Sequence, residues 1–342
     1  MKAIGSALSS PQVKACAVLL ILILPWLPLG AHTNYILRIL TTVVLYMILA
    51  LGLNIVPGFN GLLDLGYVGF YGIGAYTAGL LTVYYQVPFW LVVPLAAMHG
   101  ALWGILLGAP TLRLTGDYFA IVTFGFSELV VLIIRNELWL TRGPMGLPGI
   151  APPSIFGRVL VHGWEFFYLA LFLLAVVILI VYRLENSRIG RAWFAIREND
   201  IAAQCSGINL IGYKVTAFAI SAAIGGLGGA FYANWFKFIH PDMFKFWESI
   251  LILCLIVLGG LGSIKGTMLG ALVLIPLSEI LRMILPQSMF SARYMIYGMI
   301  LVLMMRWRPD GLIPFVKNQE QKAIKTKQRI LSKNLRSSTA GE

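Results

Sequence analysis

Long apolar segments follow one another along almost the whole chain, and they constrain its fold more than any other feature. A run of about 18 or more mostly apolar residues is typical of a helix that crosses a membrane. Only 12% of the 342 residues are charged, about half the share that a soluble domain carries. We therefore expect an all-α polytopic membrane protein with about ten transmembrane helices, at residues 15–30, 35–56, 62–84, 88–108, 118–136, 164–183, 213–235, 248–264, 267–285 and 292–306.

The basic residues predict how these helices are oriented. With ten spans and a cytoplasmic N-terminus, most of the 26 lysines and arginines fall on the cytoplasmic side, as the positive-inside rule requires. Both termini are then cytoplasmic, with a transmembrane domain at 1–310 and a basic tail at 311–342. The net charge of +12 comes from this tail and from loops facing anionic lipid, so it does not indicate nucleic-acid binding. Residues 1–31 also fit a signal peptide, although we favour an uncleaved first helix.

One long segment, at about 137–163, interrupts the predicted external side. It contains four prolines and five glycines, which restrict and turn the chain. We expect an ordered, irregular external loop. Such a loop is long enough to cover an external mouth or contact an external partner, and it can equally be a passive connector.

A second long segment, at about 184–212, is polar and lies on the predicted cytoplasmic side. Three apolar residues spaced by four and three share one helix face: Ile189, Trp193 and Ile196. Asn199 can cap a second short helix, and Gly207 is well placed to end it. The loop therefore indicates two short helices that either dock a cytoplasmic partner or rest on lipid.

The segment GFNGLLDLGYVGFYGIGAY, residues 58–76, places six glycines and an aspartate inside an apolar run. Pro57 and Gly61 predict a break in the chain, and the later glycines leave one side of the next helix nearly bare. That side is either the movable wall of a translocation path or a surface for close helix packing. Asp64, near the helix start, suits the positive end of the helix dipole.

Carboxylates within a span are also informative, because each costs roughly 2.5 to 3.5 kcal/mol and usually faces a bundle interior or water. Glu128 is the deepest of them, and it either lines a path or acts as a strut between helices. The candidate translocation-path residues are therefore Asn54, Asn60, Asp64, Gly66, Gly69, Tyr71, Gly72, Gly74 and Glu128.

Residues for soluble-enzyme chemistry do not come together in this sequence. No GxxxxGK[ST] phosphate loop occurs, the four histidines are dispersed, and the three cysteines are scattered. We expect no catalytic residue and no metal site. If the protein uses ATP, another chain must hydrolyse it.

Several motifs together resemble the permease subunit of branched-chain amino-acid ABC importers, and more specifically its LivM type. Their order and approximate spacing match that family across roughly 45–310. The motifs that carry the resemblance are LGLNIVPGFNGLLDLGYVGFYGIGAYTAGLL, LRLTGDYFAIVTFGFSELV, LTRGPMGLPGI and GRAWFAIRENDIAAQCSGINLIGYKVTAFAISAAIGGLGGAFYA.

The resemblance implies a type I ABC importer-like permease bundle in the bacterial cytoplasmic (inner) membrane. Such a subunit pairs with a second, LivH-like permease, with two cytoplasmic ATPases that bind ATP-Mg, and with an external substrate-binding protein, and it holds no cofactor itself. The segment ENDIAAQCSGIN is similar to the importers' EAA loop, although Ile201 replaces the family's first glutamate. The resemblance thus implies ATPase docking by Arg188, Arg191, Trp193, Arg197, Glu198, Asp200, Ala202, Ala203 and Gly207.

The family implies leucine, isoleucine and valine as substrates, with urea or short amides as the alternative within the same family. A self-contained secondary transporter or channel is the alternative class, with Asp64 and Glu128 as coupling or selectivity groups. The polar loop at 184–212 distinguishes the classes, because a secondary carrier needs no element that docks an ATPase.

Overall fold

The computed structural model describes residues 33–111, 117–155, 158–284, 292–308 and 311–313. The predicted span 15–30 and the tail beyond residue 313 lie outside these residues. The helices are α3 (Thr33–Leu53), η3 (Ile55–Asn60), α4 (Tyr67–Tyr85), α5 (Phe89–Thr111), α6 (Asp117–Asn136), α7 (Leu138–Thr141), η4 (Gly143–Met145), α8 (Gly163–Glu185), α9 (Arg188–Glu198), α10 (Asp200–Cys205), α11 (Leu210–Phe236), η5 (Pro241–Phe244), α12 (Phe246–Gly259), α13 (Ile264–Ile284) and α14 (Ala292–Trp307). The strands are β1 (Leu147–Pro148), β2 (Ser154–Ile155), β3 (Arg158–Val159) and β4 (Phe238–Ile239).

Each span predicted between residues 35 and 306 contains one described helix. Six stretches of the described helices are long and apolar enough to cross a membrane: Thr33–Phe59, Phe89–Pro110, Tyr118–Asn136, Gly163–Glu185, Leu210–Phe236 and Ile264–Leu281. Among the other described helices, α12 and α14 are shorter, with 14 and 16 residues, and α4 is rich in glycine and tyrosine. The described residues therefore confirm a helical bundle with several membrane spans, and the count of ten stays a prediction.

The predicted span 248–264 was too long at its C-terminal end. α12 stops at Gly259 because Gly260 and Gly262 take φ values of +118° and +84°, which no α-helix can continue through. The last carbonyl groups of α12 have hydrogen-bond partners in a distant segment of the chain. The N–H groups of Leu312 and Ile313 donate to the carbonyl oxygens of Leu258 and Gly259, each at 3.0 Å.

α11 is the longest described helix and packs against α5, α4 and α3. Glycines allow the closest approaches. A Cβ atom added at Gly74 of α4 would overlap the backbone of Gly226 of α11. One at Gly104 of α5 would lie 2.7 Å from the Cβ of Ala222. Small residues at helix crossings therefore bring the backbones of α4, α5 and α11 together.

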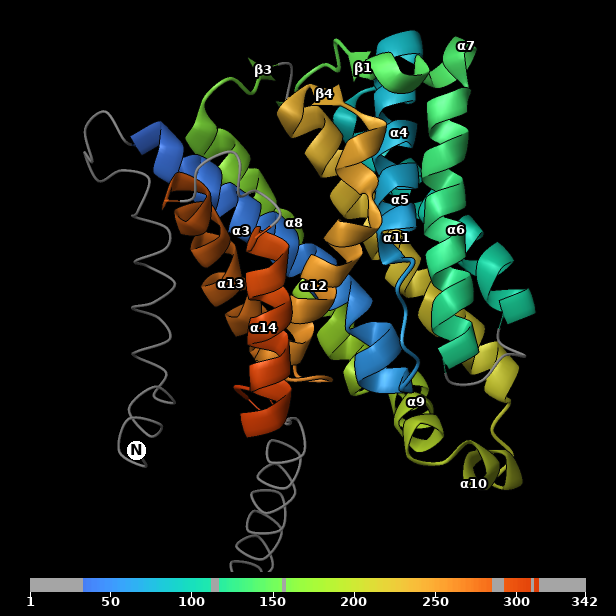
Figure 1. Ribbon diagram of the computed structural model, residues 1–342. Helices are drawn as coiled ribbons and strands as arrows, with labels where there is room; N and C mark the ends of the chain where they lie inside the picture. The colour runs from blue at the N-terminus through green and yellow to red at the C-terminus, as the bar shows by residue number, and fades with distance from the viewer. Residues whose placement is uncertain (1–32, 112–116, 156–157, 285–291, 309–310, 314–342) are drawn as a thin grey trace, which may run out of the picture.

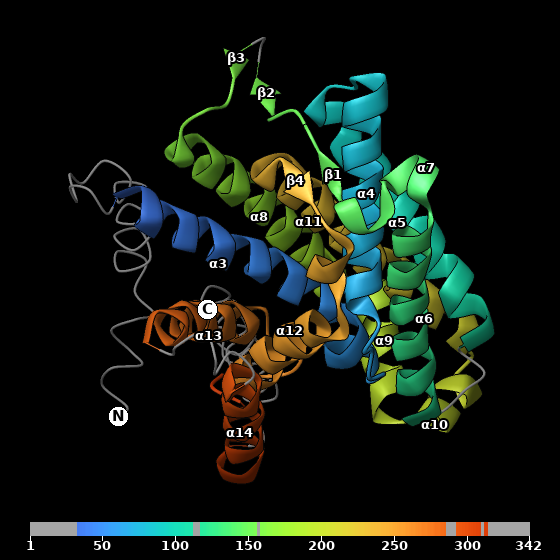
Figure 2. The ribbon, with the colours of Figure 1, turned by 45° about the horizontal axis from the view of Figure 1, so that its top comes forward.

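The described bundle has two different ends. The short strands and α7 lie at one end, which we call the hairpin end, where β1 pairs with β4 and β2 with β3, both antiparallel. α9 and α10 lie at the opposite end, which we call the loop end (Figure 1). Figure 2 shows α3 and α8 running side by side on one flank, with α5 and α6 on the other.

Candidate functional site

The helical path is interrupted near Pro57, as the sequence predicts. We call this interruption, which consists of the π-helical turn η3 and Gly61, the break. η3 ends where Gly61 takes φ +76°, a left-handed conformation that glycine adopts without strain. The fully buried side chain of Asn54 accepts the N–H of Gly262 at 2.9 Å. This bond ties the break to the turn between α12 and α13.

After the break, the chain runs without helix from Gly61 to Gly66, and α4 begins inside the bundle (Figure 1). Asp64, 1% exposed, accepts the N–H of Gly66 through Oδ1 at 2.8 Å. Hydroxyl groups of α6 and α12, those of Thr123 and Ser249, accept two further free N–H groups at 3.1 Å each, from Leu65 and Val68. Asp64 thus lies at the N-terminal end of α4, where one carboxylate oxygen satisfies a backbone N–H of the buried helix start.

Several buried polar atoms around the break have no hydrogen-bond partner among the described residues. They are Nδ2 of Asn54, both amide atoms of Asn60, Oδ2 of Asp64 and the hydroxyl of Tyr67. Buried polar groups in proteins are normally paired. The break therefore concentrates buried polar groups that other described residues do not satisfy, and the predicted role of Asn54, Asn60 and Asp64 in a translocation path stays a prediction.

The glycines at the start of α4 do not form the single bare side that the sequence predicts, because they lie against three different elements of the chain. Gly66 and Gly69 lie against α6, at Thr123 and at Phe126 with Ser127. On the other sides, Gly72 lies against Phe244 and Gly74 against Gly226. The buried Tyr71 ring packs against the rings of Tyr232 and Phe244, with centroids 5.5 and 5.1 Å away. These contacts account for the glycines by close packing, and their role as a movable wall stays a prediction.

Glu128 lies on a different face of α6 from the residues that contact α4, and its side chain is exposed. It lines a groove of about 500 Å³ between α6 and the start of α12, with Arg135 and Lys245 at the hairpin end. Both of these cations pair with Asp242. Partial burial of Asp242 opposes its ionisation, but the Lys245 and Arg135 charges outweigh it and hold the pKa of this carboxyl below its usual value.

The polar loop folds as predicted into two short helices, α9 and α10, at the loop end. The Ser187 hydroxyl caps α9 by accepting the N–H of Gly190 at 3.2 Å, and the Asn199 side chain caps α10 by accepting the N–H of Ala202 at 3.0 Å. Gly207 follows with φ +81°. The exposed members of the predicted docking set are Arg188, Arg191, Arg197, Glu198, Ala202 and Gly207, and the buried ones are Trp193 and Ala203.

The buried part of this loop anchors it to α11. The indole N–H of Trp193 donates to the carbonyl oxygen of Tyr213 at 2.7 Å. The ammonium of Lys214 pairs with half-buried Asp200 at 2.6 Å. α9 and α10 are therefore held on the bundle by specific contacts, while their other faces stay exposed.

α9 also contacts the broken helix directly. The buried ring of Phe59 in η3 stacks on Trp193 and meets Phe194 edge-on, with centroids 6.5 and 5.2 Å away. The guanidinium of Arg197 donates to the carbonyl oxygen of Gly58. The structure thus joins two features that the sequence suggested separately, the break and the two-helix loop. Glu128 stands apart from both.

Sequence reasoning missed Phe59 and the pairing of Glu248. Phe59 lies between Gly58 and Asn60. The only sequence signal for its contact role was the presence of an aromatic residue in a turn-forming segment. The Tyr46 hydroxyl of α3 donates to the Glu248 carboxylate of α12 at 2.7 Å, across 202 residues of sequence. This bond shows how one half-buried carboxylate within the bundle is satisfied.

Comparison with known proteins assigns the family. A family model described as branched-chain amino acid transport system / permease component matches residues 35–305, most of the chain. The chain belongs to this family. It is therefore a permease component of a transport system, and the exposed faces of its long apolar helices meet a membrane or other membrane subunits.

Named relatives of this permease agree with the family. The LivM permease protein of the high-affinity branched-chain amino acid transport system of Salmonella typhimurium is 42% identical over 304 residues, covering 82% of this chain and 70% of the relative. Its Escherichia coli counterpart is 41% identical over the same shares. The LivH permease protein of Salmonella typhimurium is 28% identical over 252 residues, covering 67% of this chain and 79% of the relative. No solved structure matches this permease. The relatives and the apolar helices place it in the bacterial inner membrane as a multi-pass protein.

Proposed function

We propose that this permease component carries branched-chain amino acids, namely leucine, isoleucine and valine, into the cell as part of an ATP-binding cassette importer. The observation that carries this proposal is the 42% identity to a LivM permease over 82% of the chain. The names of that relative and of the family both specify branched-chain amino acids, which favours these substrates over urea or short amides.

The proposed assembly contains a second, LivH-like permease, two cytoplasmic ATPases and an external substrate-binding protein. The importer-type resemblance of the α9–α10 loop and the matched LivH relative support this set of partners. ATP-Mg binds to the ATPases, and this chain holds no cofactor. In the proposed topology of ten helices with both termini cytoplasmic, the loop end is cytoplasmic and the hairpin end is external.

In the proposed mechanism, α9 and α10 dock on an ATPase and transmit its movement. Arg188 and Arg191 are exposed on α9 and present positive charge to acidic groups of the ATPase, while Arg197 donates to the carbonyl oxygen of Gly58 in η3. The inner face of α9 contacts η3 through the Phe59 ring and the carbonyl oxygen of Gly58. A shift of α9 therefore displaces the break between α3 and α4.

We place the translocation path where this permease meets the second one. Glu128 supports this placement, because a carboxylate exposed in the middle of a spanning helix is costly against lipid and acceptable against water or protein. Its groove also carries apolar side chains and, at the external end, the cations Arg135 and Lys245. Asp242 pairs with both cations and offsets only one of their two charges. The groove therefore still offers opposite charges flanked by apolar surface, which suits a zwitterion with a branched aliphatic side chain.

Reconstitution tests the proposal. This permease, the second permease and the ATPases are placed in liposomes with the binding protein, and uptake of radiolabelled leucine and urea is followed with and without ATP. We expect ATP-dependent accumulation of leucine by the whole assembly and none by this chain alone. Accumulation by the chain alone, or uptake of urea without leucine, contradicts the proposal.

A further inference from the structure

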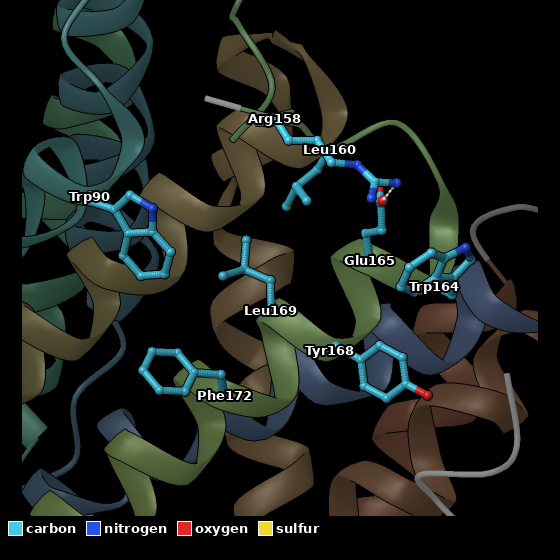
Figure 3. A pocket seen from close by; sticks show the side chains of 8 residues that line it. All are labelled: Trp90, Arg158, Leu160, Trp164, Glu165, Tyr168, Leu169 and Phe172. Atoms are coloured by element: carbon cyan, nitrogen blue, oxygen red, sulfur yellow. Dashed lines mark hydrogen bonds and ion pairs between the residues drawn. The ribbon is translucent and has the colours of Figure 1, made fainter. Parts of the chain in front are cut away.

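α8 packs chiefly on α3 and leaves a recess between itself and α5 near the hairpin end. The recess measures about 810 Å³ and is almost entirely apolar. Figure 3 shows Trp90 of α5 on one side, with Leu169 and Phe172 of α8 facing it. The other residues of the lining are Arg158, Leu160, Trp164, Glu165 and Tyr168.

Aromatic side chains form the walls of this recess. The indole N–H of Trp90 donates to the carbonyl oxygen of Ser154 at 3.0 Å, and its ring meets Phe172 edge-on at 6.3 Å. Trp164 meets Tyr168 in the same way at 6.1 Å. Trp164 and Tyr168 lie within the first two turns of a spanning helix, the depth at which tryptophan and tyrosine gather at a membrane–water interface.

One ion pair forms the polar rim. Glu165 is 5% exposed and accepts the N–H groups of Val161 and His162, at 2.8 and 3.0 Å, as well as the guanidinium of Arg158 at 3.0 Å. Both oxygens of this carboxylate are therefore engaged, Oε2 in capping α8 and Oε1 with Arg158. The Arg158 side chain is 70% exposed, and its guanidinium lies beside Glu165 at the edge of the recess (Figure 3).

We propose that the recess between α5 and α8 binds an anionic phospholipid, with its phosphate on Arg158 and one acyl chain lying along the apolar wall that Trp90 and Phe172 form together. The walls supply apolar contact for the chain, and the exposed guanidinium supplies the complementary charge at headgroup depth. An amino acid fits poorly here, because its ammonium group needs an acceptor and Glu165 is already engaged.

Native mass spectrometry of the assembled transporter tests the headgroup contact. The complex is released from nanodiscs that contain phosphatidylglycerol and phosphatidylcholine in equal amounts, and bound lipids are counted. Arg158→Gln removes the charge but leaves both backbone donors to Glu165 in place. We expect it to lower the preference for phosphatidylglycerol about fivefold, the effect of one basic residue at an anionic surface.

Arg142→Gln is the matched control. This arginine is also exposed at the hairpin end, lies outside the recess, and should leave the preference unchanged. An unchanged preference in Arg158→Gln, or an equal loss in both variants, overturns the phosphate contact and with it the proposal.

Crosslinking tests the acyl chain. Phosphatidylglycerol with a photoreactive diazirine in its chain should label peptides that contain Trp90 and Phe172. A second arm places a cysteine at Phe172 and asks for disulfides with cysteines introduced on the second permease. Lipid labelling of both peptides supports the proposal, whereas their absence or a disulfide to the second permease shows that protein fills the recess.

Discussion

The contact between η3 and α9 makes a quantitative prediction about Phe59. Its side chain is fully buried, and its ring contacts both Trp193 and Phe194. Truncating a buried phenylalanine to alanine costs about 3–5 kcal/mol, and each lost aromatic pair accounts for about 0.5–1.5 kcal/mol beyond burial. Phe59→Ala therefore removes most of the apolar attachment of α9 to the break, while Trp193 and Asp200 still anchor the loop to α11.

We expect Phe59→Ala to separate ATP hydrolysis from transport. In liposomes with all partners, the variant should hydrolyse ATP at close to the normal rate, and leucine moved per ATP should fall at least about tenfold, the equivalent of 1.4 kcal/mol. Phe167→Ala is the matched control, because Phe167 is also buried but lies near the N-terminus of α8, at the end of that helix away from α9. This control variant should lower the melting temperature by a similar amount and leave the amount of leucine moved per ATP unchanged.

Equal leucine per ATP in the two variants refutes the argument that α9 acts through the break. A loss of ATP hydrolysis in Phe59→Ala refutes it as well, because the contact would then serve docking rather than transmission. Phe59→Leu, which keeps most of the apolar volume, should recover most of the ratio.

Three further predictions concern other parts of the fold: the end of α10, the crossing of α4 and α11, and the ion pairs of Asp242. Gly207→Val places a β-branched residue at φ +81°, which costs about 1–2 kcal/mol locally; ATP-driven uptake should fall while the melting temperature of the bundle changes little, and normal uptake would count against a docking role. Gly74→Ala forces α4 away from the Gly226 backbone and should destabilise the protein by about 1–3 kcal/mol. Gly125→Ala, within α6 and with open space around its Cβ, should not lower the thermal unfolding temperature and should raise it slightly, because alanine favours the helix. The pKa of Asp242 is lowered in the folded state, so its stabilisation is complete above the unfolded pKa of about 3.9 and is lost as the pH falls through the lower folded pKa. Asp242→Asn should therefore lower stability by at most about 1 kcal/mol at neutral pH, because the pair is exposed. In unfolding scans, the difference from the unchanged protein should begin to shrink as the pH falls below about 4 and should vanish only below the folded pKa; a difference that does not shrink over that range would show that the ion pairs are not its origin.

Much of this architecture was predictable because its signals are local. Long apolar runs locate the helices, Pro57 and Gly61 locate the break, and Asn199 and Gly207 locate the two helices of the polar loop. Each of these signals acts on its own neighbours through backbone geometry or capping. The sequence alone is enough to read them.

Contacts between distant segments were not predictable. Nothing near Phe59 indicates that Trp193 will stack on it, and nothing near Asp64 indicates hydroxyl groups from α6 and α12 beside the start of α4. The role of the glycines in α4 was open for the same reason, because a bare helix face suits both sliding and close packing. Only the positions of Phe126, Phe244 and Gly226 show that these glycines lie on several sides of α4 and are covered within the chain.

The capped start of α4 has a consequence for how the protein is made. Ser249 follows Val68 by 181 residues, so α4 is synthesised and enters the membrane long before the hydroxyl that completes its cap exists. Until α12 arrives, an N–H group of α4 lacks its partner at a depth where each missing bond costs several kcal/mol. Biogenesis therefore cannot finish helix by helix. The C-terminal helices must insert before the break is stable, and a chain truncated ahead of α12 should remain a substrate for membrane quality control.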